Sequence, residues 1–113
     1  MNTKHTLKDR ETISRLFQKG TKIRVDPVLS LSLNNKNETV LFSVSKKNIP
    51  RAVDRNKIKR QMRAIFFNNR RLLNVNNPKA MAFIYLEKSI IEYSKLSSSM
   101  ITILKNANWN EEH

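Results

Sequence analysis

The chain has 113 residues, and its 22 Lys and Arg against nine Asp and Glu give a formal net charge of +13. This length fits a single domain, residues 1–113, in which we expect the ends, 1–6 and 108–113, to be mobile. The absence of Cys excludes disulfides, a disulfide-linked partner, thiolate zinc sites and a cysteine nucleophile. No apolar run reaches the roughly 18 residues of a membrane span, and no signal-peptide pattern follows the first residue. We therefore expect a cytoplasmic protein.

A short first helix is predicted over residues 9–19. Ile13, Leu16 and Phe17 recur at i, i+3 and i+4, which is the spacing of one helical stripe. Gly20 is the only glycine in the chain and follows this stripe directly. We expect it to end the helix in a left-handed cap.

Two strands are predicted next, over residues 28–33 and 40–45. In the first, leucines alternate with serines, the period of a half-buried strand. In the second, Val40, Phe42 and Val44 face one way, and the residues between them face the other. The polar residues 34–39 have the composition of a hairpin loop. The two strands are therefore expected to pair antiparallel.

The second half of the chain predicts a long helix, a strand and a last helix, over about 51–73, 80–86 and 92–107. The strand is apolar on both sides, as expected of a central strand. The long helix has an apolar arc and an opposite, cationic side. The arc holds Ile58, Met62, Ile65, Phe66, Leu72 and Leu73, and the cationic side holds Lys57, Lys59, Arg60, Arg63, Arg70 and Arg71. The order α-β-β-α-β-α indicates an α+β domain with a small sheet packed against helices.

The positive charge is concentrated in the middle of the chain. Ten cations and one acid, Asp54, lie between Lys46 and Arg71, a net charge of +9 over that segment. Arg55 with Lys59, and Lys59 with Arg63, are like-charged i,i+4 pairs, which destabilise a free helix. Phosphates lying against this side would relieve the repulsion, so we expect nucleic acid to bind here. The alternatives are a solvated helix face or a helix lying on an anionic membrane.

Catalytic motifs are absent from the sequence. The nine acids form no paired-carboxylate motif of the kind found in two-metal nucleases. One glycine cannot make a glycine-rich phosphate loop. His5 and His113 lie near opposite ends of the chain, which argues against a His-based triad or metal site. If the protein serves RNA processing, another component must supply the chemistry.

Two segments resemble the bacterial ribonuclease P protein subunit. They are Ser43-Val44-Ser45-Lys46-Lys47 and the helical run Ala52 to Arg63, AVDRNKIKRQMR. The resemblance implies a ribonucleoprotein endoribonuclease (a hydrolase) in which the RNA subunit is the catalyst. The protein would help that RNA to bind precursor tRNA and Mg²⁺, the metal being held mainly by the RNA, while the complex removes the 5′ leader during tRNA processing. It also implies an unusual left-handed βαβ crossover.

The resemblance also implies site residues. The helix and the segment before it would contact ribonuclease P RNA, and a cleft between the first helix and the sheet would take the single-stranded leader. Phe17 matches an aromatic position of that cleft, whereas Ile13 and Leu31 stand where relatives are often aromatic. The RNA-binding residues would be Lys46, Lys47, Arg51, Arg55, Asn56, Lys57, Lys59, Arg60 and Arg63. No catalytic residue and no membrane partner are expected.

Three other functions remain open from the sequence. A different basic RNA-binding module, such as a ribosomal protein, would prefer another RNA. A protein-only nuclease would cleave RNA with a metal ion and no RNA subunit. A cationic membrane-surface protein would bind liposomes in preference to RNA.

Overall fold

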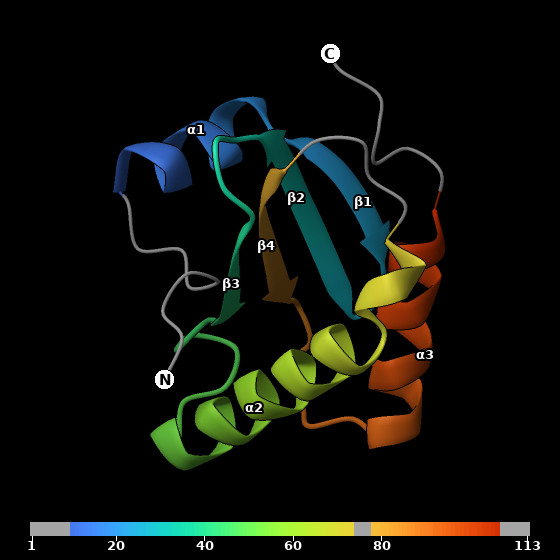
Figure 1. Cartoon of the computed structure of the whole chain (residues 1–113). Coiled ribbons are helices and arrows are strands. Elements are labelled where there is room, and N and C mark those ends of the chain that lie inside the picture. Colours follow the sequence, from blue (N-terminus) through green and yellow to red (C-terminus); the bar gives the residue numbers. More distant parts are fainter. Residues whose placement is uncertain (1–9, 74–77, 107–113) are drawn as a thin grey trace.

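A four-stranded sheet lies between helices on both of its faces (Figure 1). The computed structural model describes residues 10–73 and 78–106, so the chain ends that we expect to be mobile fall outside it. The elements in chain order are α1 Arg10–Lys19, β1 Thr21–Val25, β2 Val28–Asn34, β3 Thr39–Val44, α2 Ala52–Asn68, the 3₁₀ helix η2 Arg70–Leu72, β4 Lys79–Tyr85 and α3 Tyr93–Lys105.

The strand order is β1-β2-β4-β3, so the predicted pairing of β2 with β3 is wrong. Strand β4 lies between them, antiparallel to β2 and parallel to β3. The physical reason is burial: β4 is apolar on both faces, and only a central place in the sheet covers both. The polar residues 35–38 thus pass across the end of β4 instead of closing a hairpin.

The connection from β3 through α2 to β4 joins two neighbouring parallel strands. In Figure 1, α2 lies in front of the sheet, both strands point down, and β4 lies to the right of β3. With both strands turned to point up, β4 lies to the left. The crossover is therefore left-handed, against the general right-handed preference, as the resemblance implies.

The larger core lies between the sheet and the helices α2 and α3. Helix α2 contributes Ile58, Met62, Ile65 and Phe66, the centre of its predicted apolar arc. From the sheet, Val40, Phe42 and Val44 face this side, as predicted. The rings of Phe42, Phe66 and Phe83 contact one another, with centroids 5.4–5.9 Å apart. These contacts fix α2 across the sheet and leave its other side in solvent.

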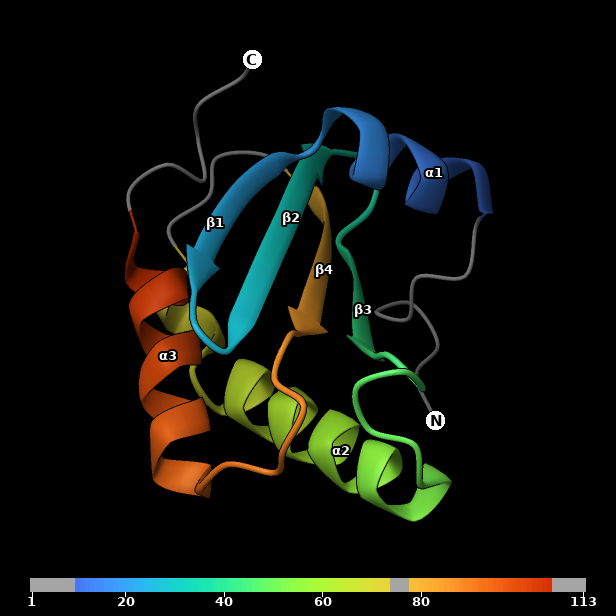
Figure 2. The same ribbon diagram turned by 180° about the vertical axis from the view of Figure 1, so that it is seen from behind.

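Helix α1 covers the opposite face of the sheet, as the reverse view in Figure 2 shows. Leu16 packs there on Leu31, Ala80 and Ala82, all of them buried. The alanines leave room for the helix to lie close to the strands.

Gly20 does not adopt the left-handed conformation that we expected, because its φ is not positive. Instead, a Cβ at this position would lie 2.4 Å from the carbonyl oxygen of Leu16 and 3.2 Å from that of Ser32. Glycine is needed because α1 turns into β1 with its backbone against the helix and against β2.

Strand β1 is absent from the sequence-based prediction, and two helix ends differ. The strand pairs with β2 through a tight turn at Asp26-Pro27, whose peptide bond is cis, and Arg24 Nε lies 2.7 Å from Asp26 Oδ1. The long helix ends at Asn68, because the Asn69 backbone N–H and side-chain amide both bond to Ile65 O. The last helix is also shorter than predicted, and its first residue, Tyr93, is 48% exposed.

Candidate nucleic-acid interface

The outward side of α2 carries most of the predicted RNA-binding residues. Asn56, Lys57, Arg60 and Arg63 are exposed, whereas Arg55 and Lys59 are half-buried. The only acid of the helix is Asp54, whose Oδ2 lies 3.9 Å from Nε of Arg51, the residue before the helix. In the described part of the chain, no carboxylate lies within 4.0 Å of the other cations of this helix. The helix therefore presents donors and positive charge with little internal neutralisation.

Two of these arginines are held by neighbouring groups. Arg55 Nη1 donates to Ile49 O at 3.0 Å and to Pro50 O at 2.7 Å, which ties the start of the helix to the preceding loop. The guanidinium of Arg63 lies 5.8 Å from the centre of the Phe42 ring, a cation–π contact. Side chains that are already oriented lose less conformational entropy on binding.

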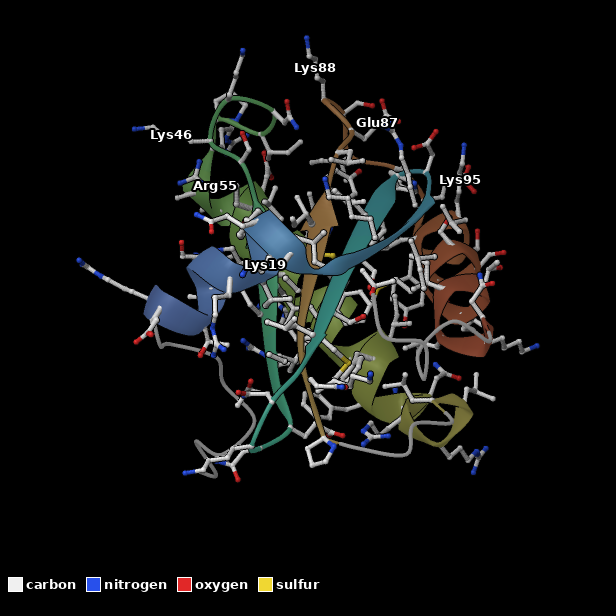
Figure 3. The ribbon with its side chains drawn as sticks, turned by 90° about the horizontal axis from the view of Figure 1, so that it is seen from above. Lys19, Lys46, Arg55, Glu87, Lys88 and Lys95 are labelled. Carbon is white, nitrogen blue, oxygen red and sulfur yellow. The ribbon has the colours of Figure 1, made fainter. Side chains whose placement is uncertain are left out.

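The loop before α2 holds three more predicted residues, Lys46, Lys47 and Arg51, all exposed. The Ser45 hydroxyl accepts hydrogen bonds from the backbone N–H groups of Lys47, at 3.0 Å, and Asn48, at 3.3 Å. The Asn48 amide donates to Leu86 O at 3.3 Å, joining the loops that follow β3 and β4. Figure 3 shows Lys46 and Arg55 where β3 passes into α2, with Lys88 extending from the end of β4. We call the nine predicted RNA-binding residues, on this loop and α2, the cationic face.

Arg70 lies outside the cationic face, although the sequence places it on the cationic side of the long helix. Its Nε donates to Glu38 Oε2 at 2.8 Å, and its Nη2 bonds to the other carboxylate oxygen. Burial lowers the pKa of Arg70 from its ordinary value. The pair fastens the loop between β2 and β3 to the end of α2, so Arg70 has a structural role.

The three predicted leader-cleft residues differ in exposure. Phe17 on α1 is 48% exposed, and Ile13 is partly buried at the edge of the core under this helix. Leu31 is only 1% exposed and packs against Leu16. In this conformation Leu31 supports α1 from below and offers no open surface.

An apolar shelf extends from α1 across the same face of the sheet. We define it by the partly buried Leu29, Leu41 and Ile84, which pack around the α1 core. Leu29 and Ser43 both pair with Ile84, so these three residues form one row across β2, β4 and β3. The shelf cannot be found from the sequence alone, because its rows depend on β4 lying between β2 and β3. The only sequence signal for it is the alternation of residues in β2 and β3, which places Leu29 and Leu41 on the opposite side from their strand neighbours.

The described residues offer no obvious metal site or membrane span. Residues 10–73 and 78–106 contain no group of three or more His, Asp or Glu side chains placed to hold a metal ion. Within the same ranges no helix is both long and apolar enough to cross a bilayer.

Comparisons with known proteins agree with this arrangement. A family model described as Ribonuclease P matches residues 1–108. The RNase P protein of Staphylococcus aureus is similar in structure, with a TM-score of 0.78, 26% identity, and coverage of 95% of this chain and 98% of that one. The RNase P protein of Thermotoga maritima gives a TM-score of 0.75 at 20% identity, covering 89% and 96% of the two chains, which shows the fold. The search of curated proteins found no match.

The family match extends over nearly the whole chain, well beyond the two segments that suggested it. It gives no support to a ribosomal protein or to another RNA-binding module. Members of this family are the protein component of the ribonuclease P enzyme, which binds RNA and processes tRNA. The chain belongs to the ribonuclease P protein family, and its implied partner is ribonuclease P RNA.

Proposed function

We propose that the cationic face binds ribonuclease P RNA through the phosphate backbone. The observation that carries this proposal is the charge of α2, whose exposed cations lack carboxylate partners among the described residues. Arginine can grip a phosphate with two parallel hydrogen bonds, whereas lysine offers a single point of charge. The mixture of both favours recognition of backbone and shape over base sequence.

The apolar shelf and Phe17 are proposed to take the 5′ leader of precursor tRNA. An exposed aromatic ring can stack on an unpaired base, and partly buried leucines can contact base edges. Leu31 is covered by α1, so the leader would contact Ile13, Phe17 and the shelf while Leu31 supports them.

The cleavage chemistry is assigned to the RNA. Magnesium prefers clusters of oxygen ligands, and the described residues bring no such cluster of carboxylates together. We therefore assign the Mg²⁺ of the holoenzyme mainly to the RNA, and no step of the reaction to a side chain of this protein. The proposed site of action is the cytoplasm, where precursor tRNA is processed.

Cleavage of precursor tRNA by the cognate ribonuclease P RNA at low Mg²⁺, with and without the protein, tests this function. The test variant is a Lys57→Ala/Lys59→Ala/Arg60→Ala triple, which keeps Arg55 because that side chain holds the preceding loop. The matched control is Lys22→Ala/Lys95→Ala/Lys105→Ala, which removes the same charge from exposed positions on β1 and α3.

Wild-type protein and the control variant should stimulate cleavage, and the test variant should not. Equal loss in both variants would mean that only total charge matters and would refute the assignment to α2. Absence of stimulation by the wild type would refute the proposed function as a whole.

A further inference from the structure

One side chain of the cationic face is in contact with the hydrophobic core. Arg63 is exposed on α2, yet its guanidinium lies 5.8 Å from the centre of the Phe42 ring. At about 100° per residue, Arg63 stands about 60° around the helix from the buried Phe66. The rings of Phe66 and Phe42 meet edge to face, with centroids 5.9 Å apart. The side chain of Arg63 therefore lies at the border between the helix and the sheet.

The Phe42 ring is held in place by the sheet. Phe42 is 6% exposed, and its ring stacks on that of Phe83, with centroids 5.7 Å apart and planes at 16°. The two residues are also direct neighbours in the ladder between β3 and β4. The electron-rich face of an aromatic ring attracts a cation above it. The ring thus gives Arg63 a preferred direction that the helix alone does not supply.

The N–H donors of Arg63 remain available to a ligand. Among the described residues, no carboxylate lies within 4.0 Å of the guanidinium, and it makes no hydrogen bond. A contact with the ring leaves these donors free to bond to the oxygens of a phosphate, which a guanidinium can grip with two parallel hydrogen bonds. An arginine that is already directed by the ring loses less conformational freedom when it binds.

We propose that Phe42 is a positioning residue for RNA binding, whose ring holds the Arg63 guanidinium in the direction in which it contacts an RNA phosphate. The inference rests on the proposed function, and it gives a buried residue of β3 an effect on affinity at the surface of α2. Leu41, the residue before Phe42, packs on the opposite face of the sheet as part of the apolar shelf. The same strand therefore directs Arg63 and carries part of the shelf, so β3 sets the relative positions of two proposed RNA contacts.

The test lowers the electron density of the ring while keeping its shape. Phenylalanines with increasing numbers of ring fluorines replace Phe42 in the full-length protein, because fluorine weakens the attraction of the ring face for a cation. The same residues replace Phe83 as the matched control, since it is buried in the same cluster and no cation of the described residues lies over its ring. Both series are made with Arg63 and with Arg63→Ala. Fluorescence anisotropy gives the affinity for ribonuclease P RNA over a salt series, and thermal unfolding gives the stability of each variant.

With Arg63 present, affinity should fall roughly 2- to 5-fold along the Phe42 series, the size of a cation–π contact at an exposed site. The slope of log affinity against log salt should stay unchanged, because the charge of Arg63 is still there. With Arg63→Ala, the Phe42 series should leave affinity unchanged, and the Phe83 series should do so in both backgrounds. An equal fall in the Phe42 and Phe83 series, a fall that persists with Arg63→Ala, or no fall at all would overturn the proposal.

The Arg63→Ala variant separates this inference from the proposed function. If it lowers the salt slope by about one unit while the Phe42 series has no effect, the phosphate contact stands and the positioning role fails. If Arg63→Ala changes neither affinity nor slope, the proposed phosphate contact of Arg63 fails on its own measurement, and the positioning role fails with it.

Discussion

Arg60 and Arg70 belong to the same basic segment, but their replacement should affect different properties of the protein. Arg60 is exposed on α2, and no carboxylate of the described residues lies within 4.0 Å of it. Arg60→Ala should lower the slope of log affinity for ribonuclease P RNA against log salt by about one unit, the value for one lost phosphate contact. Stability should change by less than about 0.5 kcal/mol, because the side chain supports no described contact.

Arg70→Ala should instead destabilise the fold. Its partner Glu38 would lose two charge-assisted hydrogen bonds while remaining only 21% exposed. A fully buried pair broken on one side costs roughly 3–5 kcal/mol. Because the Arg70 side chain is 34% exposed, solvent screening reduces our value to about 1–2 kcal/mol. For a domain of this size, that loss lowers Tm by about 5–10 °C.

Both variants would be measured by fluorescence anisotropy with labelled RNA at five salt concentrations, and by thermal circular dichroism. Glu38→Gln is the control for the ion pair, and it should lower Tm without changing the salt slope. A reduced slope for Arg70→Ala in the folded state would refute the division between structural and RNA-binding arginines. An unchanged slope for Arg60→Ala would remove that residue from the phosphate interface.

Three further substitutions test the packing. Gly20→Ala should destabilise the fold by about 1–3 kcal/mol, because its Cβ would lie 2.4 Å from the carbonyl oxygen of Leu16. Denaturant unfolding measures this loss, and an unchanged midpoint would contradict the close contact. Burial raises the pKa of Tyr85 above 10.0, so its contribution to stability is present below pH 10 and is lost as pH rises through the folded-state pKa. Tyr85→Phe should lose about 1–3 kcal/mol at neutral pH, because the hydroxyl donates a hydrogen bond to Ser89 O and accepts one from Ile91 N–H. The variant should also flatten the alkaline fall in Tm, and an equally steep fall would exclude Tyr85 as its source. Leu31→Ala should cost roughly 2–5 kcal/mol while the folded fraction still binds leader RNA, and loss of leader binding at full stability would show direct contact.

The helices could be predicted from the sequence because their signals are local. The apolar arc of α2 and its cations repeat with the helical period within one continuous segment. The cationic face follows from the same periodicity, together with the resemblance to the family. The exception is Arg70. It lies beyond the end of α2 at Asn68 and bonds to Glu38 in the loop between β2 and β3.

The order of the strands could not be predicted from the sequence, because it depends on pairing between distant parts of the chain. Proximity in sequence favours pairing of β2 with β3, yet full burial of β4 is the stronger requirement and places it between them. Strand β1 has only five residues and exposes Lys22 and Arg24, so its pattern alone is weak. The role of Gly20 depends on Ser32 O and therefore on how α1 meets β2. The apolar shelf could not be predicted either, because its residues become neighbours only in the strand order β2-β4-β3.

Because β4 is the last strand in the chain and lies in the middle of the sheet, the sheet can be completed only late in synthesis. Residue 84 pairs with residue 29 on one side and with residue 43 on the other, so both ladders join segments far apart in sequence. On a ribosome, β2, β3 and the cationic helix emerge before the strand that unites them. Until β4 arrives, the inner edges of β2 and β3 are open to wrong partners, and α2 has only part of its support. The full support of α2 by the sheet is therefore acquired only with β4, and closure of these long-range pairs should set the folding rate.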